Sequence, residues 1–352
     1  MTVNLPIRDR KIRFALVGCG RISANHMAAL QRHGERAELV AVCDNRPEAL
    51  QAAVDKTGAA GFASLDALLA GNDADIVVLA TPSGLHPRQA IKVAQAGRHV
   101  LTEKPMATKF DEGMQMVRAC REAGVKLFVV KQNRLNATMQ LLKGAIEQRR
   151  FGRIVMVNVN VFWTRPQSYY DDAPWRGRWD LDGGAFMNQA SHYVDMVDWL
   201  VGPVDNVHAY TATLARDIEA EDTGVMSLRL RSGGLASINV TMLTHGKNFE
   251  GSITVLGEKG TVRIGGVAVN EIQHWEFEDP RPEDAQVKSA NYAPPSVYGF
   301  GHPLYYDNVI RTLRGETDAA VDGYEGLRSL EVIIAAYRSA RDGQRVGLPL
   351  VF

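Results

Sequence analysis

Polar side chains that could move a proton or orient a hydroxyl recur at helical spacing near the middle of the chain. They are Asn188, His192 and Asp195, in the stretch DGGAFMNQASHYVD of residues 182–195. At about 100° per residue, they fall with Trp199 within an arc of roughly 60° on a helix that opens after two glycines. His192 titrates near neutral pH and could remove a proton from a hydroxyl. The polar face of a solvent-exposed amphipathic helix would show the same spacing. Other parts of the sequence are therefore needed to show whether these side chains line a cleft.

Strand and helix signals alternate in the first part of the chain. Short apolar runs typical of buried parallel strands recur there, separated by helical stretches. They cover residues 12–17, 38–43, 75–80, 98–101 and 126–130. This alternation predicts an α/β Rossmann domain, with a doubly wound parallel sheet, over residues 1–131.

A glycine-rich loop, GCGRIS, follows the first predicted strand and opens the first helix, which runs to about His33. Gly18 permits a tight turn, and Gly20 lets the backbone approach a pyrophosphate at the helix N-terminus. Ser23 replaces a third glycine and is small enough for helix–strand packing. In this context the loop predicts a dinucleotide site more strongly than a lone glycine pattern would.

An acidic residue, Asp44, ends the second predicted strand. Its carboxylate would accept hydrogen bonds from the adenosine ribose and repel a 2′-phosphate, which favours NAD over NADP. Arg46 complicates this reading, because its guanidinium could bind a 2′-phosphate, stack on the adenine or lie on the surface.

The pattern changes after Val130, where apolar residues alternate with polar ones. These runs cover residues 153–163, 207–214, 225–230, 235–242 and 252–256, with hairpin turns at 232–234 and 257–260. They predict an α+β domain over residues 132–352 with a large, mainly antiparallel open sheet. The last helix, about 323–342, should return toward the Rossmann domain. A free sheet face of this size could pack on another subunit, so we expect a homo-oligomer.

Composition excludes several classes of protein. The 352 residues are 45% hydrophobic and 23% charged, with 40 basic and 40 acidic side chains. Neither a nucleic acid nor a membrane is an expected partner, because there is no basic field and no long apolar run. No signal peptide is apparent, and the three cysteines fit a reducing cytoplasm, with Cys19 and Cys43 expected as buried thiols. The nine histidines show no metal-binding spacing, so no metal site is predicted.

Two further strand ends complete a recognisable pattern. They are Ala80–His86 (ATPSGLH) and Gly97–Pro105 (GRHVLTEKP). With the glycine loop and residues 182–195, they resemble the glucose–fructose oxidoreductase / inositol dehydrogenase (Gfo/Idh/MocA) family over almost the whole chain. The resemblance implies an NAD-dependent dehydrogenase that oxidises a secondary alcohol.

The resemblance also assigns roles near the reacting carbon. His192 would face the substrate hydroxyl opposite the nicotinamide. Lys104, at a strand end where such sheets bind ligands, should have a lowered pKa beside that cationic ring. Asn188 stands where many relatives carry aspartate, so we expect it to orient the substrate. Whether His192 or Lys104 is the main base stays open, with His192 preferred.

Within the family, residues 163–170 (WTRPQSYY) and 175–177 (WRG) resemble bacterial UDP-N-acetylglucosaminuronic acid 3-dehydrogenases. This implies a UDP-linked uronic acid substrate, oxidised at C3 during the biosynthesis of diacetamido uronic acids of lipopolysaccharide O-antigen. Arginines near aromatic residues could bind its diphosphate and carboxylate. They could equally pair with neighbouring aspartates on a surface loop. A tetramer is favoured, and 2-oxoglutarate is a possible second substrate that would reoxidise bound NADH.

Two other functions remain open: a dehydrogenase of free sugars or inositols, and a non-catalytic NAD-sensing regulator of the same fold. The predicted catalytic residues are Lys104, His192 and Asn188. The predicted cofactor-binding residues are Gly18, Gly20, Arg21, Ile22, Asp44, Arg46, Thr81, Ser83, His86, Glu103, Lys104 and Gln132. The predicted substrate-binding residues are Lys104, Arg165, Gln167, Tyr169, Tyr170, Trp175, Arg176, Arg178, Asn188 and His192. His302, Tyr305 and Tyr306 are weaker candidates, for which a core role fits equally well.

Overall fold

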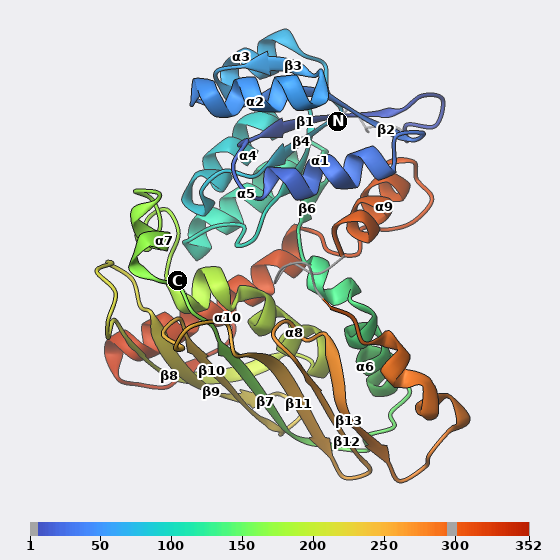
Figure 1. The fold of residues 1–352 in the computed structure, drawn as a ribbon, viewed down its shortest axis with the longest axis vertical. Helices are drawn as coiled ribbons and strands as arrows, with labels where there is room; N and C mark the ends of the chain where they lie inside the picture. Colours follow the sequence, from blue (N-terminus) through green and yellow to red (C-terminus); the bar gives the residue numbers. More distant parts are fainter. Residues whose placement is uncertain (1–5, 294–300, 352) are drawn as a thin grey trace. The chain divides into compact units, whose positions relative to one another are not determined.

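The computed structural model describes residues 6–293 and 301–351. The chain divides into two compact units, one of residues 1–131 with 302–327 and the other of residues 132–301 with 328–352 (Figure 1). The segment that rejoins the first unit therefore carries α9 (Gly301–Leu313) and only the first turn of α10 (Gly323–Asp342).

The first unit is built on a parallel sheet. Within the described residues it has six strands in the order β3-β2-β1-β4-β5-β6. These are β1 Ile12–Val17, β2 Ala37–Cys43, β3 Ala60–Phe62, β4 Ile76–Leu79, β5 His99–Thr102 and β6 Leu127–Val129. Its other helices are α1 Ser23–Arg32, α2 Pro47–Thr57, α3 Leu65–Gly71, α4 His86–Gln95 and α5 Phe110–Glu122. Strands β4, β5 and β6 are buried along their whole length, as expected for parallel strands covered on both faces.

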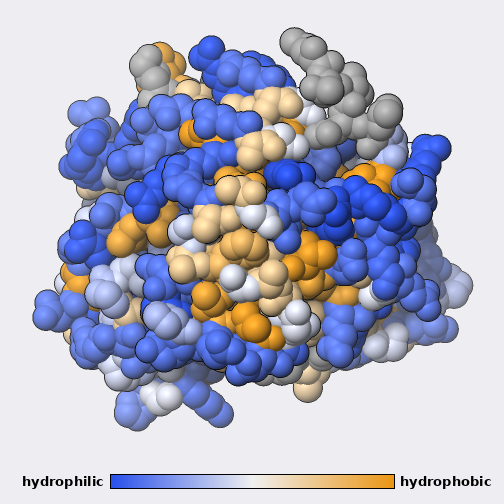
Figure 2. All heavy atoms as spheres, turned by 90° about the horizontal axis from the view of Figure 1, so that it is seen from above, coloured by the Kyte–Doolittle hydropathy of each residue, from blue (hydrophilic) through white to orange (hydrophobic). Residues whose placement is uncertain are grey.

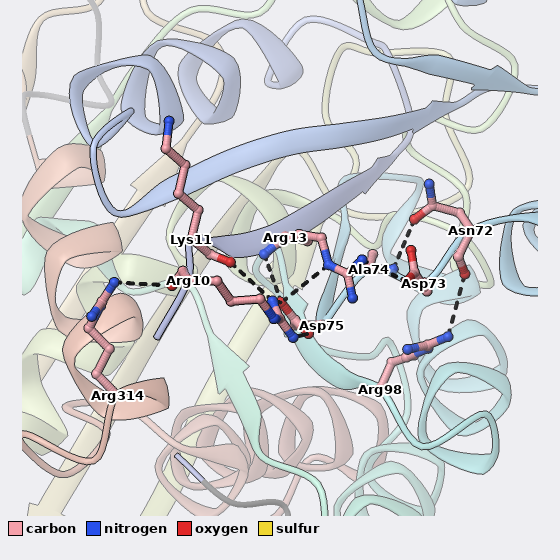
Figure 3. Close-up of polar contacts among 9 residues, drawn as sticks. All are labelled: Arg10, Lys11, Arg13, Asn72, Asp73, Ala74, Asp75, Arg98 and Arg314. Atoms are coloured by element: carbon pink, nitrogen blue, oxygen red, sulfur yellow. Dashed lines mark hydrogen bonds and ion pairs between the residues drawn. The ribbon is translucent and has the colours of Figure 1, made fainter. Parts of the chain in front are cut away.

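Asp75 ties together the amino ends of the central strands (Figure 3). Its carboxylate accepts two hydrogen bonds from the Arg10 guanidinium, at 2.6 and 2.7 Å, and one from the Arg13 backbone N–H at 2.8 Å. The Asp75 backbone also bonds to Arg13 and to His99. This cluster lies at the edge opposite the carboxyl ends of the strands, so it supports the sheet rather than a ligand site.

The second unit is built on a mixed, mainly antiparallel sheet. Over the described residues it has eight strands in the order β13-β12-β11-β7-β10-β9-β8-β14, with β7 and β10 parallel. These are β7 Ile154–Phe162, β8 Val204–Ala212, β9 Thr223–Leu230, β10 Leu235–Thr241, β11 Glu250–Gly257, β12 Gly260–Gly265, β13 Glu271–Phe277 and β14 Val346–Gly347. Its other helices are α6 Ala137–Glu147, α7 Gln167–Asp171 and α8 Ser191–Val201. The predicted fold class is confirmed for both sheets.

The two faces of this second sheet differ in chemistry. Val157, Val159 and Val161 of β7 are fully buried. The intervening side chains form polar cross-strand pairs: Asn158 donates to Ser237 at 2.8 Å, and Asn239 donates to Asn160 at 3.0 Å. The alternation of apolar and polar residues in the sequence therefore corresponds to a sheet with one apolar, packed face and one polar face.

Exposed apolar side chains are a minority on the face drawn in Figure 2, where hydrophilic residues surround a smaller hydrophobic area. Some apolar exposure is ordinary for a folded protein. None of the helices in the described residues is long and apolar enough to cross a membrane.

Candidate active site

The glycine loop between β1 and α1 combines a tight turn with open space. Gly18 has φ +97°, and a Cβ there would lie 2.6 Å from the Ala80 carbonyl oxygen. At Gly20, no described atom lies within 4 Å of an ideal Cβ. The Ser23 hydroxyl donates to the Gly20 carbonyl oxygen at 2.6 Å, which fixes the start of the helix. The loop thus leaves room beside Gly20 for the close approach of a ligand phosphate.

Asp44 holds this loop through its carboxylate. One oxygen accepts from the Cys19 backbone N–H at 2.8 Å, and the other accepts from the Arg46 N–H at 2.8 Å. The Asp44 side chain is 8% exposed, whereas that of Arg46 is 65% exposed, with its Nε 3.7 Å from Asp44. Arg46 therefore lies on the surface near the carboxylate. Cys43 is buried as predicted, but the prediction for Cys19 was wrong, because that thiol is only partly covered.

A histidine joins the loops that follow β4 and β5. His86 Nε2 lies 2.9 Å from the Thr81 carbonyl oxygen, and His86 Nδ1 lies 3.0 Å from that of Pro105. The Thr81 hydroxyl donates to Gln89 at 2.6 Å, and Ser83 is buried. These predicted cofactor residues thus help to shape the carboxyl edge of the parallel sheet.

Lys104 follows β5 between two buried neighbours, and its own side chain is partly exposed. Its backbone N–H donates to the Glu103 carboxylate at 3.1 Å. The other Glu103 oxygen lies 3.1 Å from His26 Nε2 and 3.6 Å from His302 Nε2. Burial raises the pKa of Glu103, but the contacts with the two imidazoles outweigh it and hold that pKa well below the usual value.

His26, Glu103 and His302 also offer donor atoms that lie within 4.8 Å of one another, the geometry of a possible metal group. The sequence prediction of no metal site considered only short spacings and could not detect this cluster. The weaker candidates lie in the same core: Tyr306 packs against Phe14, and the Tyr305 hydroxyl donates to the Val129 carbonyl oxygen at 2.6 Å.

In the second unit, the segment that carries Asn188 and His192 is not one continuous helix. Residues Ala185–Gln189 form a π-helix, closed by the Ala190 N–H to the Ala185 carbonyl oxygen at 2.9 Å, and α8 starts at Ser191. Nearly every side chain of α8 is buried. This burial excludes the alternative of a helix with a solvent-exposed polar face, and it agrees with the preferred interpretation that the polar side chains do not face open solvent.

Two polar contacts connect α8 with the segment Gln132–Leu135. The Gln132 amide lies 3.3 Å from His192 Nε2. Arg134 donates to both oxygens of Asp195, at 2.7 and 2.8 Å, with both side chains buried. Gln132, predicted to contact the cofactor, is thus placed beside the predicted catalytic histidine.

The π-helix begins on a glycine pair that is packed against a buried carboxylate. Gly183 has φ +78°, and a Cβ at Gly184 would lie 1.8 Å from Glu221 Oε2. Glu221 Oε1 accepts from the Phe186 N–H and from the Tyr337 hydroxyl, each at 2.8 Å. Burial raises the pKa of Glu221 to about 7.

Asn188 lies beside a second acidic residue, Asp182, to which its amide donates. Asp182 also accepts from the Gly177 N–H at 2.8 Å. This contact fixes the amide orientation, which suits the predicted role of Asn188 in orienting a substrate.

A cluster of cations and aromatic rings includes Arg165, Tyr169 and Arg176. The Arg165 and Arg176 guanidinium carbons lie 5.4 and 4.2 Å from the centre of the Tyr169 ring. Arg165 Nη2 donates to Gln189 at 2.9 Å, and Gln189 donates to the Tyr169 hydroxyl at 3.3 Å. Arg176 Nε is buried and has no hydrogen-bond partner among the described residues. The cluster concentrates positive charge on stacked side chains, which suits binding of a phosphate or carboxylate.

The structure does not bring all the predicted substrate residues into this cluster. Arg178 pairs with Asp180 at 3.0 Å on the surface, as the alternative interpretation of the loop anticipated. Gln167 bonds to Asp171 at 2.9 Å, and Tyr170 is buried. Trp175 does contact the cluster, because the Arg176 guanidinium carbon lies 5.5 Å from the centre of its ring.

Sequence reasoning missed several residues that support these sites: Asp182, Gln189, Glu221 and Tyr337. Asp182 and Gln189 belong to the stretch of residues 182–195 that also carries Asn188 and His192. Glu221 and Tyr337 are distant in sequence, and no pattern connects them with the glycine pair.

Comparison with known proteins shows which family the chain belongs to. Residues 12–131 match the NAD-binding Rossmann fold of the Gfo/Idh/MocA oxidoreductase family, and residues 143–348 match its C-terminal alpha/beta domain. The chain belongs to this family, and the resemblance stated from the sequence is confirmed.

Two solved structures are similar over essentially the full chain. The WlbA dehydrogenase from Bordetella pertussis, in complex with NADH and UDP-GlcNAcA, is 69% identical over 98% of this chain and 100% of its own, with a TM-score of 0.96. The WlbA dehydrogenase from Chromobacterium violaceum, with the same two ligands, is 66% identical over 100% of both chains, also with a TM-score of 0.96. A more distant relative, inositol 2-dehydrogenase from Rhizobium meliloti, is 27% identical over 96% of this chain and 99% of its own.

Proposed function

We propose that this protein is an NAD-dependent dehydrogenase that oxidises the C3 hydroxyl of UDP-N-acetylglucosaminuronic acid to the 3-keto sugar. The observation that carries the proposal is the 69% and 66% full-length identity to two dehydrogenases bound to NADH and UDP-GlcNAcA. The residues fit the same chemistry: a glycine loop with open space at Gly20, and a cluster of Arg165 and Arg176 suited to oxyanions. The product would serve the biosynthesis of diacetamido uronic acids of lipopolysaccharide O-antigen.

The two predicted domains divide this work in our proposal. Residues 1–131 form the NAD-binding domain, and residues 132–352 form the domain for substrate binding and oligomerisation. NAD, when bound, accepts the hydride from C3. His192 takes the hydroxyl proton, while Lys104 positions that hydroxyl and Asn188 orients the sugar. Arg165 and Arg176 bind the diphosphate or the uronate carboxylate.

The assembly proposed is a homotetramer formed through the polar face of the second sheet. The hydrogen-bonded rows of short side chains on β7 and β10 make this face suitable for close packing against a copy of itself. Light scattering at micromolar concentration tests this, and a monomer would contradict it. We also propose a cytoplasmic location, which suits three cysteines that are free in the described structure.

The direct test is to mix the purified protein with NAD and UDP-N-acetylglucosaminuronic acid and to follow NADH absorbance, with and without 2-oxoglutarate. NADH formation with NAD and sugar alone supports the dehydrogenase with free cofactor release. Turnover seen only as 2-hydroxyglutarate means that 2-oxoglutarate reoxidises bound NADH. Good NAD binding without turnover in either case would contradict the proposed substrate.

A pair of arginines provides a matched control for substrate recognition. Arg165→Ala should lower kcat/KM for the UDP sugar by about 10- to 100-fold, because a charged hydrogen bond to the substrate is lost. Arg178→Ala should leave it unchanged, because Arg178 pairs with Asp180 on the surface. Equal kinetics for both variants would favour a smaller, neutral sugar as substrate.

A further inference from the structure

We propose that His26 and His302 are positioning residues for Lys104: through the Glu103 carboxylate, they fix the loop after β5 that carries this lysine. The inference deepens the proposed function and rests on it for the role of Lys104. It concerns two histidines of the first unit, His26 and His302, that the proposed chemistry does not otherwise use.

The chain of contacts starts at a tyrosine. The Tyr306 hydroxyl lies 2.8 Å from His26 Nδ1, and His26 Nε2 lies 3.1 Å from Glu103 Oε1. Burial lowers the pKa of His26, which favours its neutral form. Neutral His26 can then accept from the tyrosine at Nδ1 and carry its proton at Nε2, which lies beside the carboxylate in electrostatic contact without hydrogen-bond geometry.

His302 approaches the same carboxylate oxygen from α9, at 3.6 Å, with its ring edge-on to that of His26. The other Glu103 oxygen accepts from the backbone N–H of Lys104 at 3.1 Å. The carboxylate therefore connects two side chains from distant helices with the peptide of the lysine.

The burial of this group argues against an ordinary core role. His26, His302 and Glu103 are 0%, 3% and 7% exposed, yet Lys104 is only partly buried. Burying a carboxylate costs free energy unless it is well paired, and apolar side chains would fill the same space without that cost. His86 holds the carbonyl oxygen of Pro105 on the far side of the lysine. Lys104 thus emerges from a backbone that is fixed both before and after it.

A metal ion is the other occupant that the three donor atoms allow. His26 Nε2 and Glu103 Oε1 are 3.1 Å apart, but neither buried atom makes a hydrogen bond in the described residues, so their contact is an electrostatic one. Metal content is therefore an outcome of the test, because an ion between the three donor atoms is the alternative.

The experiment compares His26→Asn, His302→Gln and the milder Tyr306→Phe with a matched control, His99→Asn. His99 is also buried and lies in β5, the strand that Glu103 and Lys104 follow, but its Nδ1 accepts from the Lys126 N–H at the opposite end of β5. For each protein we would measure kcat, KM, NAD affinity, zinc content and hydrogen exchange at the Lys104 amide.

The expected result is a fall in kcat of about 10- to 100-fold in the His26 and His302 variants, as for a misplaced catalytic group, with NAD affinity unchanged. Exchange at the Lys104 amide should become faster in the same variants, with a smaller change in Tyr306→Phe. His99→Asn should alter neither kcat nor this exchange.

Three outcomes would overturn the inference. The first is Lys104 exchange that stays at the wild-type rate in His302→Gln, and the second is one equivalent of zinc in the wild type that this variant loses. The third is a kcat in the His26 and His302 variants equal to that of His99→Asn. If the wild type does not oxidise the UDP sugar, the proposed function fails, and the exchange rate alone decides whether the two histidines hold the loop.

Discussion

Two glycine-containing turns, one in each unit, look alike in sequence and differ in what surrounds them. The turn before α1 has Gly18 at φ +97°, and the turn before the π-helix has Gly183 at φ +78°. In each, a backbone N–H donates to a carboxylate from another element: Cys19 to Asp44, and Phe186 to Glu221.

The second glycine of each turn shows the difference. Beside Gly20 the space is open, whereas beside Gly184 it is filled by the Glu221 carboxylate. A glycine can therefore admit a ligand or make room for the protein's own side chain. Sequence alone does not separate these two uses, but substitution does.

The largest effect on stability is expected at Gly184, in the turn where the Glu221 carboxylate fills the space (the filled turn). In Gly184→Ala the new Cβ would meet Glu221 Oε2 at 1.8 Å and the Glu221 carbonyl oxygen at 2.5 Å. Overpacking against a buried carboxylate and backbone should lower the free energy of unfolding by more than about 4 kcal/mol. Urea unfolding measures this, and Gly347→Ala is the control, because no described atom lies within 4 Å of its Cβ. Equal stability of the two variants would mean that the turn and Glu221 can shift to accommodate the methyl group at little cost.

The second largest effect is expected at Glu221, in the pH dependence of the free energy of unfolding. Burial raises its pKa from 4.5 to about 7 in the folded protein. The folded state therefore binds the proton more tightly than the unfolded state. This stabilisation is fully present below about pH 4.5 and is lost as the pH rises through about 7, a change of about 3 kcal/mol.

Glu221→Gln should remove this dependence, because the amide oxygen can still accept from Phe186 and Tyr337. The measurement is the difference in unfolding free energy between wild type and variant from pH 4.5 to 8. Glu219→Gln, at an exposed site two residues earlier, is the control. Parallel pH curves for wild type and Glu221→Gln would contradict the raised pKa.

The sequence predicted much of the scaffold, because hydrophobic periodicity is a local signal. Strand β1 and helix α10 have the predicted boundaries. Strands β3, β12, β13 and β14 were not predicted. Strand β3 has only three residues, Ala-Gly-Phe, and β14 has two, while β12 follows directly on the predicted hairpin turn at 257–260. β13, with the sequence EIQHWEF, exposes most of its side chains, so its apolar pattern is weak.

The surroundings of the site were less predictable, because they depend on long-range contacts. The π-helix interrupts a spacing that looks continuous in sequence, so the arc calculated for Asn188, His192 and Asp195 does not apply. The partners of Glu103 are another example, since His26 and His302 reach it from α1 and α9. Only the fold brings them together.

Asn188, in the π-helix that follows Gly184, offers a third test of this comparison. Asn188→Asp would place a second carboxylate against Asp182, and both could not ionise at neutral pH without a cost of about 2 kcal/mol. We expect kcat/KM to fall by about tenfold or more. The double variant Asp182→Asn, Asn188→Asp restores one carboxylate and one amide and should recover part of the loss. No recovery would mean that the two side chains do not act as a pair.

The smallest effect is expected at the open turn, and it should appear in binding rather than in folding. Gly20→Ala adds a methyl group where no described atom lies within 4 Å, so the free energy of unfolding should stay near the wild-type value. If the pyrophosphate of NAD approaches this backbone, the methyl group should weaken NAD binding by about tenfold, or 1.4 kcal/mol. Titration of NADH fluorescence measures this, with Gly347→Ala again as control. Lost stability would show that the turn is packed like the one at Gly184, and unchanged affinity would place the phosphates elsewhere.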